Sequence, residues 1–129
     1  MNLLAIVAGV SALAHLAFAY KECHWERSFV ESAAPGWIRP QDTHAHIMWA
    51  EPLAFNMASY NLLLALGLTV TAWAATVDDR AARWLGSLFG VWLLGAAAAA
   101  GLTGVYLALA LQGVLGLLLL MAAWRRRPA

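Results

Sequence analysis

The chain contains long stretches without a single Lys, Arg, Asp or Glu, and these stretches limit what it can fold into. They are Asn2–Tyr20, Pro52–Val77 and Trp84–Trp124. A helix needs about 20 consecutive apolar residues to cross the hydrocarbon core of a bilayer. Because lipid offers no partner for a free backbone N–H or C=O group, helices are the structure expected for such stretches. The first two stretches therefore each predict one membrane-spanning helix.

The third stretch is about twice as long as one span requires. As a single helix it would reach roughly 60 Å at 1.5 Å per residue. The sequence Gly101-Leu102-Thr103-Gly104 lies near its middle and favours a tight turn, because glycine adopts left-handed backbone readily. We therefore predict an all-α, integral membrane four-helix bundle that forms one domain over residues 1–129. The predicted helices are at about 2–22, 48–77, 84–101 and 103–124, with an external loop at about 23–47.

The composition agrees with a chain that is solvated largely by lipid. Of the 129 residues, 63% are hydrophobic and 12% are charged, whereas soluble domains have about 45–50% apolar and about 25% charged residues. The net charge of +1 gives no case for a nucleic-acid surface. No Lys or Arg precedes the first apolar stretch, so we expect a retained first helix rather than a cleaved signal peptide.

Lys and Arg predict the orientation. With four spans, both termini and the Asp78–Arg83 segment share one side, which holds Arg80, Arg83 and Arg125–Arg127. Because cytoplasmic loops carry an excess of Lys and Arg, we expect this side to be cytoplasmic. The predicted location is a bacterial cytoplasmic (inner) membrane, with the loop between the first two helices outside.

Polar groups inside a predicted span are candidates for function, because they are costly in lipid. His15 and Glu22 are seven residues apart and share one face of the first helix. On the second helix, Asn56 and Tyr60 fall close together around the axis, while Asn61 lies further round. We predict that His15 and Glu22 face Asn56 and Tyr60 in a pocket that opens outward; the alternative is that each residue only fixes helix packing. The candidate pocket residues are His15, Glu22, Asn56, Tyr60, Asn61 and Gln112.

Small residues predict close helix contacts on the third helix, where Gly86 and Gly90 have small-xxx-small spacing. The predicted packing residues are Gly86, Gly90, Gly95 and Gly101.

Outside the spans, imidazole and carboxylate groups gather at both ends of the external loop, and such groups suit zinc, copper or iron. A metal ion held by His24, His44, His46 and Glu51 is one interpretation; interfacial polar residues without a ligand are the other.

The pattern resembles a family of small membrane proteins of similar length, catalogued as domain of unknown function 1304. The first helix carries His15-Leu16-Ala17-Phe18 followed by Glu22 and Trp25. Asn56-Met57-Ala58-Ser59-Tyr60-Asn61 resembles the family's Asn-Gln-Gly-x-Tyr-Asn stretch, with Met57 and Ala58 in place of Gln and Gly, and Gln112-Gly113 matches in the fourth helix. The resemblance implies four helices and a shared polar site of Glu22, Asn56, Tyr60 and Asn61, and it implies no activity.

Three functions of different classes fit these features. The first is a non-catalytic accessory subunit that packs against other membrane-protein chains, in a hetero-complex or a homo-oligomer. It is favoured by the small size, the Gly- and Ala-rich third helix and the absence of a nucleophile beside a base. The second is a small enzyme or ligand-binding protein that uses the polar pocket. The third is a minimal dimeric transporter. The position of Glu22 argues against this function, because Glu22 lies at the end of its span, whereas a coupling site belongs near the midplane.

Overall fold

The computed structural model describes residues 2–23, 45–102 and 106–125, and over 45–54 it describes the helix but not the side chains. This part of the chain is all helical. The helices are α1 (Leu3–Cys23), α3 (Ala45–Val77), α4 (Asp79–Leu102) and α5 (Tyr106–Arg125). All four are long and apolar enough to cross a membrane, the apolar part of α3 being Phe55–Val77. The predicted all-α class and the four apolar helices are confirmed.

The junction between α3 and α4 differs from the prediction. The charges of Asp78–Arg83 predict a break between two helices, but α4 begins at Asp79, five residues before the predicted start. Asp78 alone interrupts the helices, and its Oδ1 accepts hydrogen bonds from the backbone N–H groups of Arg80 (2.9 Å) and Ala81 (3.0 Å). This is the geometry of a helix N-cap, which satisfies donors that have no partner inside the helix.

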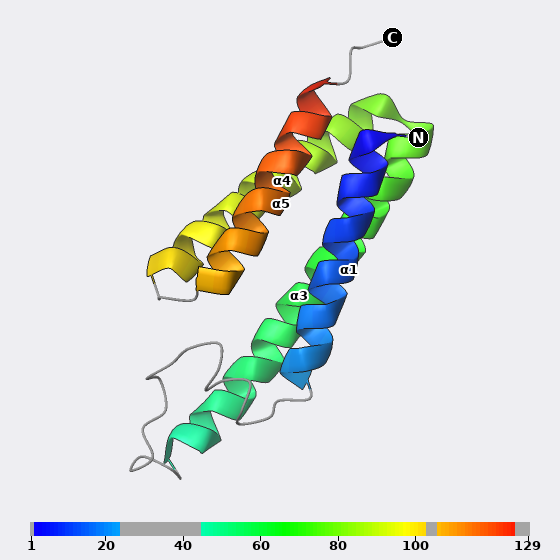
Figure 1. The fold of residues 1–129 in the computed structure, drawn as a ribbon. Helices are drawn as coiled ribbons and strands as arrows, with labels where there is room; N and C mark the ends of the chain where they lie inside the picture. The colour runs from blue at the N-terminus through cyan, green and yellow to red at the C-terminus, as the bar shows by residue number, and fades with distance from the viewer. Residues whose placement is uncertain (1, 24–44, 103–105, 126–129) are drawn as a thin grey trace.

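The helices form two antiparallel pairs (Figure 1). α1 lies along α3, and α4 lies along α5, while contacts between the pairs are made mainly by α3 with α4 and by α1 with α5. The start of α1 and the end of α5 lie at the same end of the molecule, where the pairs come together (Figure 1). Toward the opposite end the two ribbon pairs diverge.

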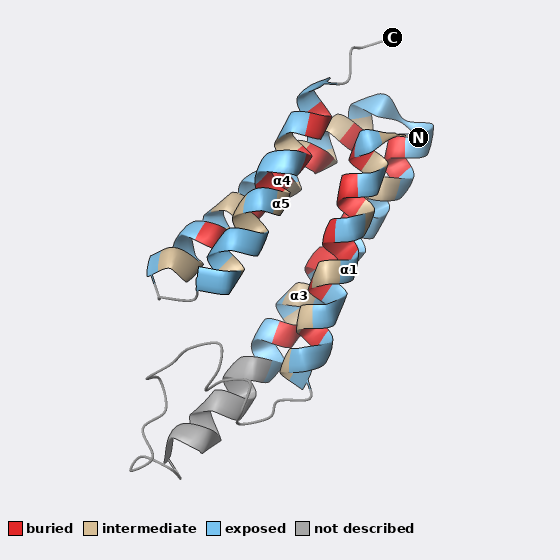
Figure 2. Cartoon of the chain, viewed as in Figure 1, coloured by how far each residue is buried: buried red, intermediate tan, exposed pale blue. Residues whose placement is uncertain are grey.

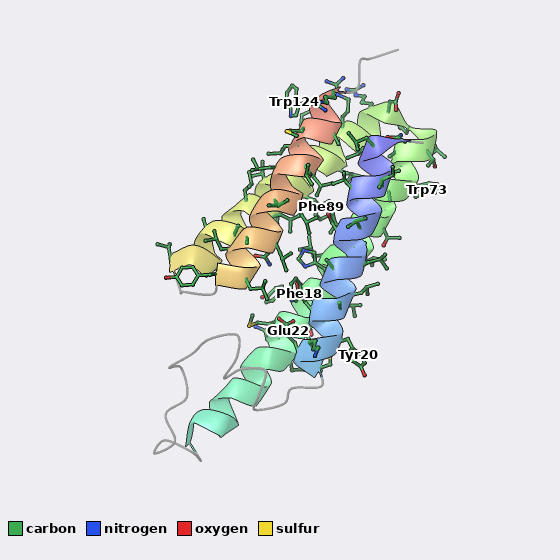
Figure 3. The ribbon with its side chains drawn as sticks, in the orientation of Figure 1. Phe18, Tyr20, Glu22, Trp73, Phe89 and Trp124 are labelled. Atoms are coloured by element: carbon green, nitrogen blue, oxygen red, sulfur yellow. The ribbon has the colours of Figure 1, made fainter. Side chains whose placement is uncertain are left out.

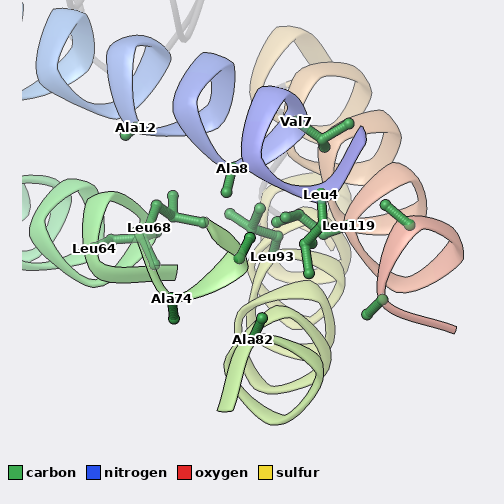
Figure 4. Packing of buried hydrophobic residues seen from close by; sticks show 13 residues of the cluster. Leu4, Val7, Ala8, Ala12, Leu64, Leu68, Ala74, Ala82, Leu93 and Leu119 are labelled. Carbon is green, nitrogen blue, oxygen red and sulfur yellow. The ribbon is translucent and has the colours of Figure 1, made fainter. Parts of the chain in front are cut away.

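Buried residues line the inner faces of the helices, and the outer faces are exposed (Figure 2). The largest fully buried apolar side chains come one from each helix: Leu4, Leu68, Leu93 and Leu119. They belong to one cluster at the end where the pairs meet (Figure 4). Asn2 ties the start of α1 to this end, since its Nδ2 donates to the carbonyl oxygen of Ala75. The core therefore joins all four helices near the chain's start.

Glycines bring α4 and α5 into backbone contact. A Cβ added to Gly116 would lie 2.9 Å from the carbonyl oxygen of Gly90, and one added to Gly90 would lie 3.1 Å from the carbonyl oxygen of Gly116. A Cβ on Gly86 would meet Leu4 at 3.0 Å and Ala123 at 3.2 Å. The two predicted packing residues Gly86 and Gly90 thus lie in tight contacts.

The other two predicted packing glycines, Gly95 and Gly101, do not lie in tight contacts. Gly95 is exposed, and a Cβ added to it would have no neighbour within 4 Å, because Gly95 faces away from the buried stripe of α4. A Cβ on Gly101 would make only an ordinary contact, 3.4 Å from Leu109. Gly67 of α3 is a further close contact, since a Cβ added to it would clash with the ring of Phe89 on α4.

Candidate functional site

A polar site connects α1 to α3 on the half of α1 that leads to Cys23. His15 and Glu22 lie on one side of α1, as their spacing of two helical turns predicts. His15 is completely buried and Glu22 is partly buried. Figure 3 labels Glu22 beside α3 and Phe18 one turn before it, whereas Tyr20 points away from the bundle. The side of α1 that carries the polar groups is therefore the side that packs on α3.

One carboxamide links the two α1 side chains. His15 Nδ1 lies 2.7 Å from Oδ1 of Asn61, and Nδ2 of Asn61 donates to Oε2 of Glu22 at 2.7 Å. The result is a continuous hydrogen-bonded chain, His15–Asn61–Glu22, that crosses between the helices twice. Both links include groups that would be costly to leave unsatisfied in lipid.

The bond between His15 and Asn61 is consistent with one tautomer of the imidazole. A carboxamide oxygen is only an acceptor, so Nδ1 of His15 carries the proton that it donates to Asn61. In the neutral ring, Nε2 is then an acceptor. Nε2 is buried and has no hydrogen-bond partner among the residues that the structure describes. The ring of Phe18 lies edge-on to the imidazole ring of His15, with 5.8 Å between the two ring centroids.

The predicted partners on α3 are placed differently. Asn56 is exposed and Tyr60 is 60% exposed, so the α3 side chain that meets His15 and Glu22 is Asn61. Gln112 of α5 is partly buried. The structure thus brings together His15, Glu22 and Asn61 of the six predicted pocket residues.

A signal for Asn61 is present in the sequence. Asn61 continues a line of buried residues on α3, Ala58, Ala65 and Leu68, at spacings of three and four. Two of these are alanines, which allow a neighbouring helix to approach closely. The clustering of Asn56 with Tyr60 identifies a polar face, but it does not show which way that face points.

The predicted metal ligands fall outside the described side chains. His24 and His44 lie in the undescribed segment, and His46 and Glu51 belong to α3 where only the backbone is described. Among the described residues, no group of His, Cys, Asp or Glu side chains is arranged to hold a metal ion. The metal site therefore stays a prediction.

No family model matches the chain, and no curated protein and no solved structure matches it either.

Proposed function

We propose that the chain is an integral protein of a bacterial cytoplasmic membrane, with both termini in the cytoplasm. Four apolar helices of spanning length support the membrane location. The start of α1 and the end of α5 lie at one end (Figure 1), where Arg80 and Arg83 lie beside the last turn of α5. Arg125–Arg127 follow Trp124 in the sequence. The positive-inside rule assigns that end to the cytoplasm.

Within that membrane, we propose that the protein is a non-catalytic accessory subunit that packs against another membrane-protein chain. One observation carries this proposal: Asn56 and Tyr60 are exposed inside the apolar part of α3, Phe55–Val77. They are four residues apart and therefore neighbours on one helix face. Neither has a hydrogen-bond partner among the described residues.

Five hydroxyl side chains of the spans bond to the backbone of their own helix. The hydroxyl groups of Ser11, Ser59, Thr69, Thr71 and Thr76 each donate to a backbone carbonyl three or four residues earlier in the same helix. The carboxamide of Asn56 and the phenol of Tyr60 make no such bond. In lipid each would lose hydrogen bonding worth roughly several kcal/mol, and polar side chains of a second chain would restore it.

Affinity purification of the tagged full chain in a mild detergent tests this proposal. We expect a stoichiometric membrane-protein partner with the unmodified chain. The double variant Asn56→Ala plus Tyr60→Phe should lose it. Thr69→Val is the matched control, because Thr69 is an exposed polar residue of the same helix that bonds its own backbone, and it should keep the partner. Absence of a partner, or equal loss in both variants, contradicts the proposal.

A second function is favoured by the unpartnered Nε2 of His15. An unsatisfied buried polar atom costs about 1–3 kcal/mol, and a small molecule that presents an O–H or N–H group would remove that cost. We therefore propose, as the alternative, a binding protein for such a hydrogen-bond donor. The proposed likeness to domain of unknown function 1304 points to the same place, because His15, Glu22 and Asn61 are among the residues that carry it.

Histidine-selective ¹⁵N NMR of the protein in detergent separates the two functions. The His15→Gln variant identifies the His15 signals by their absence. If Nε2 gives the signal of an unprotonated imidazole nitrogen and shifts when copurified small molecules are removed, the binding function holds. If copurified material has no effect on that signal, the binding function is wrong and the accessory function is unaffected.

A further inference from the structure

A groove opens at the end of the bundle where α3, α4 and α5 meet. Its volume is about 730 Å³, and it runs from the α3–α4 junction to the last turn of α5. This size is within the range of about 300–1,000 Å³ that is usual for small-molecule sites. The groove is distinct from the His15–Asn61–Glu22 chain, none of whose residues line it.

One face of α4 forms a wall of the groove. Arg80, Arg83, Trp84 and Ser87 all line it, and their spacing of three, four and seven residues from Arg80 places them on the same side of the helix. At 1.5 Å per residue, Ser87 lies roughly 10 Å further along the helix than Arg80. The wall therefore changes from cationic to aromatic to weakly polar along the direction that enters the span.

Tryptophans flank the groove on two helices. Trp84 of α4 and Trp124 of α5 both line it and are each 71% exposed, and Figure 3 shows Trp124 at the end of α5. Exposed indole rings at the ends of apolar helices are typical of the level of lipid headgroups. Ala123 and Val77 supply apolar lining.

Charge at this end is positive on balance. Asp78 and Asp79 also line the groove, but one oxygen of Asp78 already accepts two backbone hydrogen bonds. Arg125 follows Trp124 directly, and Arg126 and Arg127 come next in the sequence. Among the described residues of the chain segments that meet here, the three arginines Arg80, Arg83 and Arg125 stand against the two aspartates Asp78 and Asp79.

We propose that this groove binds the headgroup of one anionic phospholipid. The guanidinium groups of Arg80 and Arg83 hold the phosphate, since arginine recognises phosphate oxygens through a planar fork of N–H donors. The indole rings of Trp84 and Trp124 border the glycerol and ester region. Basic pockets between spanning helices take anionic headgroups in this way. The acyl chains continue along the exposed apolar surface of α4 and α5, which no soluble anion would use.

Native mass spectrometry of the full chain tests the proposal. The protein is purified in detergent, supplied with an equal mixture of phosphatidylglycerol and phosphatidylcholine, and the lipids retained per protein are counted. We expect one phosphatidylglycerol retained in preference to phosphatidylcholine. Arg80→Gln plus Arg83→Gln should reduce that retention about thirtyfold, because each arginine near the membrane surface is worth about 1 kcal/mol.

A control variant removes the same charge elsewhere. Arg27→Gln plus Arg39→Gln changes two arginines in the segment that joins α1 to α3, and it should retain phosphatidylglycerol like the unmodified chain. Arg80→Lys plus Arg83→Lys keeps the charge and should retain more lipid than the glutamine pair. Equal retention of both lipids by the unmodified chain overturns the proposal, whether or not any variant folds. Displacement of the lipid by millimolar inorganic phosphate overturns it as well, because the groove would then be a site for soluble phosphate.

Discussion

Asn61 uses both ends of its carboxamide, and this makes it the residue on which the polar site depends. Its oxygen accepts from His15 and its amino group donates to Glu22, each over 2.7 Å. Aspartate in the same place keeps the acceptor for His15 but loses the donor for Glu22. The site then sets two acidic groups within hydrogen-bonding distance of each other, which is unfavourable when both are ionised.

We therefore predict that Asn61→Asp destabilises the protein by about 1–3 kcal/mol, and that Glu22→Gln added to it restores most of the loss. A glutamine at position 22 donates to the new aspartate, whereas in the unmodified background it still accepts from Asn61 and changes little. Unfolding midpoints in a detergent titration of the four proteins measure this coupling. A shift by Glu22→Gln of the same size in both backgrounds would show that residues 22 and 61 do not interact.

Residue spacing predicts part of this site and misses the rest. The helical period predicts that His15 and Glu22 share one face of α1, and in the structure both side chains bond to Asn61. The same period puts Asn61 further round α3 than Asn56 and Tyr60, yet Asn61 is the residue that faces α1. In a helix that is apolar on all sides, polar residues do not define the inner face. The small residues Ala58 and Ala65, which permit close approach, define it better.

At the scale of helices, Asp78 decides where α3 ends and α4 begins. Asp78→Ala should lower stability by about 1 kcal/mol, because two backbone N–H groups of α4 lose their acceptor. Asp78→Asn should cost much less, since asparagine is an equally good N-cap residue. Thermal unfolding in detergent measures both. If alanine and asparagine are equivalent, the carboxylate oxygen is not acting as a cap.

The contact between α4 and α5 gives a second prediction for helices. Gly116→Ala should weaken their packing, because its Cβ would lie 2.9 Å from a backbone oxygen that cannot rotate away. Gly95→Ala is the matched control, with open space at the new methyl group, and it should be neutral or slightly stabilising since alanine favours helix. Unfolding midpoints that fall equally in both variants would rule out a tight crossing at Gly116.

The lengths of the uncharged stretches predict the four helices well, but they predict the ends of the helices less well. The apolar stretches are the only segments that lipid can solvate, so the four spans follow from where charges are absent. This criterion misses the start of α4, because the charges of Asp79–Arg83 mark where the membrane begins rather than where the helix begins. An Asp at the N-cap and another in the first turn are both favourable there, and these signals place the start correctly.

The arrangement of the whole molecule depends on contacts that composition does not reveal. α1 with α3 and α4 with α5 form the extensive contacts, and the buried cluster lies at the end where the pairs join (Figure 4). Each helix exposes large apolar side chains as well as burying them. Because lipid is as apolar as the bundle interior, hydrophobicity does not distinguish the inner faces. Small residues and hydrogen-bonding side chains carry that information instead.

Topology is the prediction that belongs to the whole molecule. An even number of spans brings the start of α1 and the end of α5 to one end (Figure 1), and the excess of arginine predicts a cytoplasmic location for that end. A reporter fused after Ala129 should therefore be cytoplasmic, and one inserted at Gly36 should be external. Replacing Arg125–Arg127 with glutamine should weaken this preference, because those residues are three of the five arginines that set it. A cytoplasmic signal at Gly36 with an external signal at Ala129 would overturn the orientation, whereas signals from the same side at both positions would overturn the four-span topology.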